Sequence, residues 1–275
     1  MRFPALKTFT TLFTLLLTAC ASLPTPESRL QKANSLASAQ GWESLTLALE
    51  NFELLAFFPR TIKPSPALTI YLEGDGHAWA NSSTPAQDPS PLDPLALRLA
   101  LAHPTQNAAY LARPCQYTKA ASKPCPARYW TGARFSSEVI TATSQAVDQL
   151  KTRFDATQLT LVGYSGGAAV AALVAARRHD VVRLVTVAGN IDHRAWTTFH
   201  RVTPLRESLD PMQDLAALGQ IPQWHFAGSH DNIVPAKLVE SFTKRLPNAH
   251  LVTMAGYDHR CCWAENWPQL LTKVQ

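Results

Sequence analysis

The stretch QLTLVGYSGGAAVAALVAARR, residues 158–178, decides the fold of this chain. The run 158–162 is short and apolar, which is typical of a strand buried on both faces of a parallel sheet. From Gly167 onward the stretch is rich in Ala and apolar nearly all round, which predicts a helix packed against that sheet. The glycine-rich sequence Gly163-Tyr-Ser-Gly-Gly167 lies between the two. We therefore predict a strand, a sharp turn and a helix in direct succession.

The same alternation extends in both directions along the chain. Apolar runs predict one or two strands over 46–58 and further strands at 67–72, 108–112, 181–188, 223–227 and 250–254. Helical spacing predicts helices at 136–154, 235–246 and 263–274, and a short one at 95–101 within a long surface loop over 75–104. This alternation indicates an α/β fold with a doubly wound, mostly parallel sheet. The interval 188–214 has room for at most a small helical cap, so we expect little or no lid domain.

The first residues are predicted to form a targeting signal. Arg2 and Lys7 precede an apolar segment over 9–17, which is shorter than the roughly 20 apolar residues of a comfortable membrane span. The segment ends at Leu17-Thr-Ala-Cys20 and resembles the signal of bacterial lipoproteins, in which the cysteine is lipidated and the preceding peptide is removed. The resemblance implies an exported protein that is anchored to a bacterial membrane through Cys20.

We therefore expect three parts: a signal peptide over 1–19, a polar tether over 20–43 and one α/β domain over 44–275. The tether is predicted because its residues are rich in Ser, Thr and Pro. Residue 21 is Ala rather than Asp, which favours the outer membrane by resemblance to Gram-negative lipoproteins. An ordinary signal peptide, or a buried helix with an incidental cysteine, is the alternative interpretation.

The remaining cysteines fit an exported protein, in which an even number suggests disulfides. Cys115 and Cys125 flank a short loop, so we expect them to pair with each other, which leaves the adjacent Cys261 and Cys262. Crossed pairing between the two sites is the alternative, since four cysteines allow three connectivities. No Cys-x-x-Cys or His-x-x-x-His spacing occurs, and no metal site is predicted.

Charge and length narrow the class of protein. The 275 residues suit one large α/β domain, and only 16% of them are charged, with a formal net charge of +5. No dense run of Lys and Arg with interleaved aromatic residues occurs in the interior. The composition therefore argues against a protein that binds nucleic acids.

The turn over 163–167 matches the pattern Gly-x-Ser-x-Gly, which presents a serine on a strained turn between a strand and a helix. A hydroxyl is a weak nucleophile and needs a base. Asp231 follows the predicted strand over 223–227, and His259 follows the last predicted strand. The order Ser165, Asp231, His259 and their places at the carboxyl ends of strands predict a catalytic triad. Asp258 is a weaker candidate for the acid, and His230 competes for the base.

From about residue 44 to its end, the chain resembles the α/β-hydrolases of the esterase, lipase or thioesterase type. The resemblance implies that Ser165 attacks an acyl carbon, that His259 moves the proton and that Asp231 holds the imidazole. It implies a small-molecule acyl substrate and no metal or organic cofactor. A serine peptidase or an acyltransferase of the same fold is an alternative, as is a binding lipoprotein without activity on this scaffold. A cofactor-free haloperoxidase or lyase is a more distant one.

The oxyanion hole is expected to combine the backbone N–H of Gly166 with that of Asp75, or next that of Gly76, in the loop after the predicted strand over 67–72. This loop departs from the usual His-Gly pattern because it carries Glu73 and Asp75. Carboxylates beside a site that stabilises negative charge are unfavourable unless they point away or pair with a cation.

Two arginines are candidates for that cation. Arg113 and Arg134 lie in the segment 113–137, in a position where loops commonly shape the pocket. They either pair with Asp75 or select an acidic substrate, and the sequence leaves both open.

Overall fold

The computed structural model describes residues 23–118 and 123–274. The predicted signal peptide and the lipidation site Cys20 lie outside these residues. Within the described ranges, no helix combines the length and the apolar character that crossing a bilayer requires.

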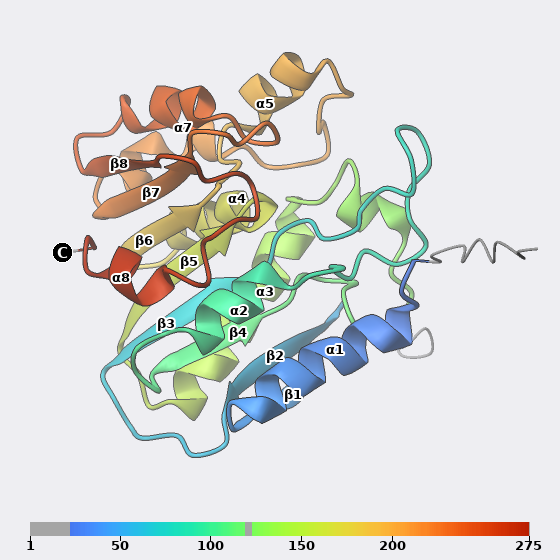
Figure 1. Ribbon diagram of the computed structural model, residues 1–275, viewed down its shortest axis with the longest axis vertical. Coiled ribbons are helices and arrows are strands. Elements are labelled where there is room, and N and C mark those ends of the chain that lie inside the picture. The colour runs from blue at the N-terminus through green and yellow to red at the C-terminus, as the bar shows by residue number, and fades with distance from the viewer. Residues whose placement is uncertain (1–22, 119–122, 275) are drawn as a thin grey trace, which may run out of the picture.

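One twisted sheet forms the centre of the domain (Figure 1). Its strands lie in the order β1-β2-β4-β3-β5-β6-β7-β8. The pairs β1/β2 and β2/β4 are antiparallel and all other neighbours are parallel. The predicted fold class is confirmed, and the strands are β1 Trp42–Ala48, β2 Glu53–Pro59, β3 Ala67–Leu72, β4 Ala108–Leu111, β5 Gln158–Tyr164, β6 Val181–Val187, β7 Gln223–Gly228 and β8 Ala249–Met254.

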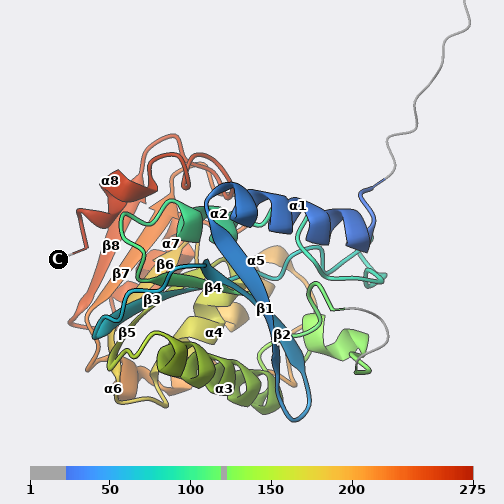
Figure 2. The same cartoon turned by 90° about the horizontal axis from the view of Figure 1, so that it is seen from below.

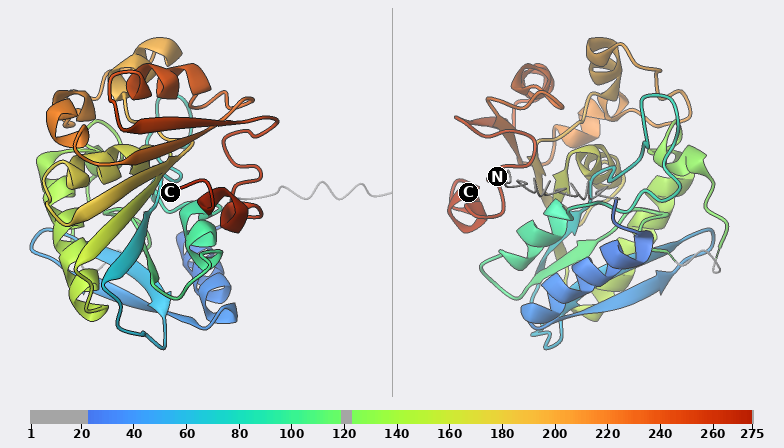
Figure 3. Two further views of the ribbon diagram at one scale, coloured as in Figure 1. Left: turned by 90° about the vertical axis from the view of Figure 1, so that its left-hand side faces the viewer. Right: turned by 45° about the vertical axis from the view of Figure 1, so that its right-hand side comes forward.

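Helices cover both faces of the sheet, as Figures 2 and 3 show. Helices α1, α2 and α8 lie on one face, and α3, α4 and α6 lie on the other. The helices are α1 Pro26–Ala39, α2 Leu95–Leu101, α3 Ser137–Arg153, α4 Gly166–Ala175, α5 His193–His200, α6 Leu215–Leu218, α7 Ala236–Thr243 and α8 Trp267–Leu271. Short 3₁₀ helices span Ala127–Trp130 and Pro211–Gln213.

The alternation of side chains along a strand builds two cores. In β2, Leu54, Ala56 and Phe58 belong to the cluster that contains α3 and α4, whereas Leu55 and Phe57 belong to the cluster on the opposite face. Because successive side chains of a strand point to opposite faces, a strand buried on both sides is apolar at every position. This is why the strands were recognisable as uninterrupted apolar runs.

The prediction of a tether over 20–43 is wrong for its described part. Helix α1 begins behind Thr25, whose hydroxyl oxygen accepts a hydrogen bond from the N–H of Ser28, and Pro26 occupies its first turn. Ala33 and Ala37 are fully buried against the sheet, and β1 already begins at Trp42. The folded domain therefore includes α1 and does not start at residue 44.

Two other predicted segments differ from the structure. The interval 75–104 contains α2 at the predicted place, but the rest is not a surface loop throughout: it folds back through hydrogen bonds from His77 N–H to Pro89 O and from Ala86 N–H to Ala78 O. The last predicted helix, 263–274, is helical only over α8. Pro268 stands in the first turn of α8, where proline is favoured.

Candidate active site

Ser165 sits on the turn between β5 and α4, with φ +51° and ψ −121°. A positive φ is sterically strained for any residue other than glycine, so contacts with surrounding residues must stabilise this conformation. A side chain at Gly163 would place its Cβ 2.5 Å from Ala168 Cα, and one at Gly167 would place it 2.5 Å from Leu72 O. The two outer glycines of the pattern are therefore required by close packing of the turn.

The structure brings the three residues of the predicted triad together. The Oγ of Ser165 lies 3.0 Å from Nε2 of His259, and Nδ1 of His259 lies 2.8 Å from Oδ2 of Asp231. The other oxygen of Asp231 accepts hydrogen bonds from the backbone N–H groups of Ile233 and Val234, at 2.8 and 2.7 Å. The Asp231 side chain is completely buried, so it is fixed in the orientation that holds the imidazole.

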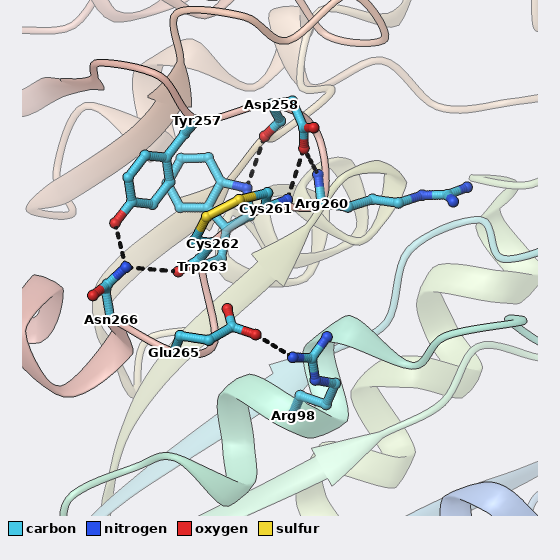
Figure 4. The surroundings of a disulfide bond; sticks show 9 residues. All are labelled: Arg98, Tyr257, Asp258, Arg260, Cys261, Cys262, Trp263, Glu265 and Asn266. Atoms are coloured by element: carbon cyan, nitrogen blue, oxygen red, sulfur yellow. Dashed lines mark hydrogen bonds and ion pairs between the residues drawn. A yellow bond between two sulfur atoms is a disulfide. The ribbon is translucent and has the colours of Figure 1, made fainter.

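The two competing residues do not enter this arrangement. Oδ1 of Asp258 accepts hydrogen bonds from the N–H groups of Arg260 and Cys261, both at 2.7 Å (Figure 4). These bonds hold the pKa of Asp258 below its usual value. The carboxylate of Asp258 therefore stabilises the turn that follows β8. His230 is exposed to solvent and lies next to Asp231 in the chain.

The residues that follow His259 also stabilise the turn that carries it. Cys261 and Cys262 form a disulfide, and Cys115 pairs with Cys125, so the structure contains the preferred pairing and not the crossed one. The indole N–H of Trp263, which is fully buried, donates to the carbonyl oxygen of Asp258 at 3.0 Å (Figure 4).

The predicted oxyanion residues lie beside the serine. Asp75 and Gly76 line the same cavity as Ser165, and the Asp75 side chain lies against the Cα of Gly166. Within the described chain, the N–H groups of Asp75 and Gly166 have no hydrogen-bond acceptor. Gly76 has φ +65° and packs directly onto the carbonyl oxygen of Pro89, a contact that leaves no room for a side chain.

The charge of Asp75 is compensated by the two candidate arginines. Nη1 of Arg113 lies 3.3 Å from Oδ1 of Asp75, and Nη1 of Arg134 lies 2.5 Å from Oδ2. Burial alone would raise the pKa of Asp75, but the two guanidinium groups hold it below its usual value. Both arginines are almost fully buried, so this cluster of one carboxylate and two guanidiniums places net positive charge beside the loop over 73–77, which carries the predicted oxyanion residues Asp75 and Gly76.

A second set of contacts fixes the backbone of the loop over 73–77. The side-chain N–H of Gln116 donates to the carbonyl oxygen of Gly74 at 2.9 Å, and its Oε1 accepts from the N–H of Arg113 at 3.0 Å. The Cys115–Cys125 disulfide closes the loop that begins between Arg113 and Gln116. Gln116 was not predicted as part of the site, because only the fold brings it there.

Glu73, the residue at the end of β3, is a buried acid without a cation in contact. It is 1% exposed, and its Oε1 accepts from the N–H of Gly74 at 2.9 Å. Burial raises its pKa to about 7, although the N–H groups of Gly74 and Ala96 and the nearby hydroxyl of Tyr110 favour the charged form. Unlike Asp75, this side chain is therefore protonated through much of the acidic range.

The cavity at Ser165 has a volume of about 360 Å³. Much of its wall is apolar and comes from Trp79, Leu92, Leu95, Trp196, Ile233 and Val234. Trp196 belongs to α5, the small helical element between 188 and 214, and its indole N–H donates to the carbonyl oxygen of Ile233 at 2.6 Å. A larger groove of about 970 Å³ lies between α1 and β1, and it contains none of the triad residues.

Apart from the triad, most residues of the cavity wall were not predicted, because no local sequence pattern distinguishes them. Asn190 is an example: its N–H donates to the carbonyl oxygen of Ser165 at 2.9 Å from the loop after β6. In the described ranges, no group of three or more His, Cys, Asp and Glu side chains is placed to hold a metal ion.

Solved structures share this architecture. An α/β serine hydrolase homologue from Coxiella burnetii is 17% identical, with a TM-score of 0.55, over 84% of this chain and 95% of that one. Est1E from Butyrivibrio proteoclasticus is 14% identical, with a TM-score of 0.56, over 84% and 96%. A putative lipase from Acinetobacter baumannii AYE is 13% identical, with a TM-score of 0.58, over 90% and 93%. These likenesses show the α/β-hydrolase fold.

A comparison with curated proteins found no match. The profile of the family described as Serine hydrolase (FSH1) matches residues 99–260, a range that contains Ser165, Asp231 and His259. The chain therefore belongs to the FSH1 family of serine hydrolases.

Proposed function

We propose that this protein hydrolyses a carboxylic ester or thioester of a small molecule through an acyl-enzyme on Ser165. The observation that carries the proposal is the continuous contact from Ser165 Oγ to His259 Nε2 at 3.0 Å and from His259 Nδ1 to Asp231 at 2.8 Å. Two N–H groups without an acceptor in the described chain stand beside this serine, which is where an oxyanion needs donors.

The reaction proceeds in two steps, acylation of Ser165 and hydrolysis of the acyl-enzyme. His259 takes the proton of the Ser165 hydroxyl while Oγ attacks the carbonyl carbon, and the carbonyl oxygen becomes an anion that the N–H groups of Asp75 and Gly166 stabilise. The tetrahedral intermediate collapses, the bond to the alcohol or thiol breaks, and His259 donates its proton to that leaving group. Water then attacks the acyl-enzyme by the same route and releases the acid. Asp231 remains ionised and orients the imidazole throughout.

Two observations favour ester hydrolysis over the alternatives. A binding protein on a hydrolase scaffold has no need for the contact between His259 and Ser165, or for a strained serine turn. Several structural neighbours are described as esterases or lipases, which supports an ester substrate over a peptide. Acyl transfer differs from hydrolysis only in the acceptor of the acyl group, and product analysis separates the two.

We also propose that the protein is exported and anchored to the outer membrane through a lipid on Cys20, after removal of residues 1–19. The support is the signal sequence itself. Because α1 begins at Pro26, such an anchor would hold the folded domain close to the bilayer. Metabolic labelling with an alkyne fatty acid should mark the wild type and not Cys20→Ser. Equal labelling of the wild type and Cys20→Ser would refute the anchor on Cys20.

Labelling with a fluorophosphonate tests the catalytic proposal without knowledge of the substrate. The wild type should react rapidly, Ser165→Ala should not react, and His259→Ala and Asp231→Asn should react far more slowly. Asp258→Asn serves as the matched control for Asp231→Asn, because Asp258 lies next to His259 and does not contact its ring. Folded, oxidised wild type that fails to react would refute the hydrolase mechanism.

A further inference from the structure

Arg260 is a charged side chain of the cavity that has no acidic partner among the described residues. It lines the cavity together with Ser165 and His259, and it is exposed. Its N–H is bound to Asp258, which fixes its backbone at the edge of the site. Figure 4 shows its side chain extending away from Asp258 and from the Cys261–Cys262 disulfide.

The acidic groups of the cavity wall are either paired with cations or buried. Asp75 lies between two buried guanidiniums, as described above. Asp93 pairs with Arg98 at 3.0 Å and with Lys32 at 3.3 Å. Glu73 is buried without a cation in contact, which favours its neutral form. Arg260 is therefore the exposed cation without an acidic partner at the edge of the cavity, and the buried cluster of Asp75, Arg113 and Arg134 adds charge of the same sign.

The place of Arg260 specifies which part of a substrate it meets. His259 hands its proton to the leaving group, so the departing alcohol must stand at Nε2 of His259. Arg260 follows His259 directly in the chain and lines the same cavity, so we expect its guanidinium to lie nearer the alcohol part of a bound ester than the acyl part. A guanidinium binds phosphate and carboxylate through paired, charge-assisted hydrogen bonds.

We propose that the substrates are carboxylic esters whose alcohol part carries an anionic group, a phosphate or a carboxylate, and that Arg260 binds this group. This inference rests on the proposed esterase function. The apolar part of the wall complements it: Trp79 and Ile233 line the cavity and are 40% and 49% exposed, so they offer contacts to the acyl chain. The preferred substrate class is an anionic amphiphile with a single scissile ester.

Four esters with one common acyl group test the proposal. We would measure kcat/KM for the hexanoyl esters of glycerol, glycerol phosphate, glycerate and choline. The wild type should favour glycerol phosphate or glycerate over glycerol by about tenfold or more. The two anionic arms distinguish a phosphate ligand from a carboxylate ligand. Because Arg260 is exposed, the preference should shrink in 0.5 M NaCl, which screens charges beyond about 4 Å.

The variants locate the source of the preference. In Arg260→Gln the ratio of anionic to neutral turnover should fall towards one, and Arg260→Lys should keep part of it. Arg245→Gln is the matched control, because Arg245 is exposed, makes no ion pair within the described chain and does not line the cavity. It should keep the wild-type ratio, which excludes an effect of net charge alone.

The outcomes separate this inference from the proposed function. Turnover of hexanoyl glycerol without any preference for the anionic esters, or a preference that survives in Arg260→Gln, would overturn the role of Arg260 and leave the esterase intact. A preference for hexanoyl choline would assign the selective charge to Glu73 or Asp93 instead. Absence of turnover on all four esters, together with absence of fluorophosphonate labelling, would refute the proposed function itself.

Discussion

Oδ2 of Asp75 lies 2.5 Å from Nη1 of Arg134, although these residues are 59 positions apart in the chain. Asp75 is at once a proposed donor of the oxyanion hole, through its N–H, and a carboxylate that would repel the oxyanion. Its pairing with Arg134 and Arg113 removes this conflict, because the two guanidiniums more than neutralise the carboxylate. The same contacts fix the backbone that carries the N–H.

We predict that Asp75→Asn lowers kcat by about tenfold or more and changes KM little, because a displaced N–H acts mainly on the transition state. Stability should fall as well, since two buried guanidiniums lose their counter-charge. Turnover per active site, titrated with the fluorophosphonate, separates the two effects. The control is Arg128→Gln, which removes a surface ion pair with Glu207 and should have almost no effect. Unchanged kcat per titrated site would contradict this role of Asp75.

Glu73 makes the stability of the protein depend on pH. Its pKa rises from 4.5 to about 7 on folding, so the folded state binds a proton that the unfolded state has lost between these values. The contribution of Glu73 to the free energy of unfolding is fully present below pH 4.5 and is lost as the pH rises towards 7. The loss is on the order of 3 kcal/mol in the free energy of unfolding.

In Glu73→Gln, urea denaturation between pH 4.5 and 8 should show a flatter decline than in the wild type, because Gln cannot ionise. Comparing the two proteins removes the contributions of other titrating groups, such as His103, whose pKa burial lowers to about 4. Parallel stability curves for the two proteins would show that Glu73 ionises normally.

The sequence predicted β3 and α2 to the residue and the other strands to within a few positions, apart from the start of β1, because the buried strands lack a polar face. It predicted the triad for a related reason: the glycines at 163 and 167 are required by contacts within the turn and against β3, and they mark the serine locally. The cluster of Asp75, Arg113 and Arg134 has no such local sequence pattern, because its residues come from three separate segments of the chain.

Helix α1 was missed because its buried residues, Arg29, Ala33 and Ala37, include no large apolar side chain. Ala33 and Ala37 belong to the core, but most other residues of the helix are polar, so the sequence resembles a soluble linker. We predict that Ala37→Asp lowers the free energy of unfolding by at least about 2 kcal/mol, because it buries an unpaired carboxylate. Ala39→Asp is the matched control: Ala39 is exposed, and the change should cost about 0.5 kcal/mol. Equal effects would mean that α1 is not part of the folded core.

The Cys115–Cys125 disulfide should matter for activity as well as for stability, because it closes the loop next to Arg113 and Gln116. Replacing both cysteines by Ser should lower the free energy of unfolding by about 2–3 kcal/mol, the usual cost of opening a short loop. It should also lower kcat per titrated site, because Gln116 holds the carbonyl of Gly74 and Arg113 holds the carboxylate of Asp75. Gln116→Ala keeps the disulfide and removes one of these contacts, so it should reproduce part of the kcat loss with a smaller loss of stability. If the double serine variant loses stability but turns over at the wild-type rate per site, the loop stabilises the domain and does not position the oxyanion hole.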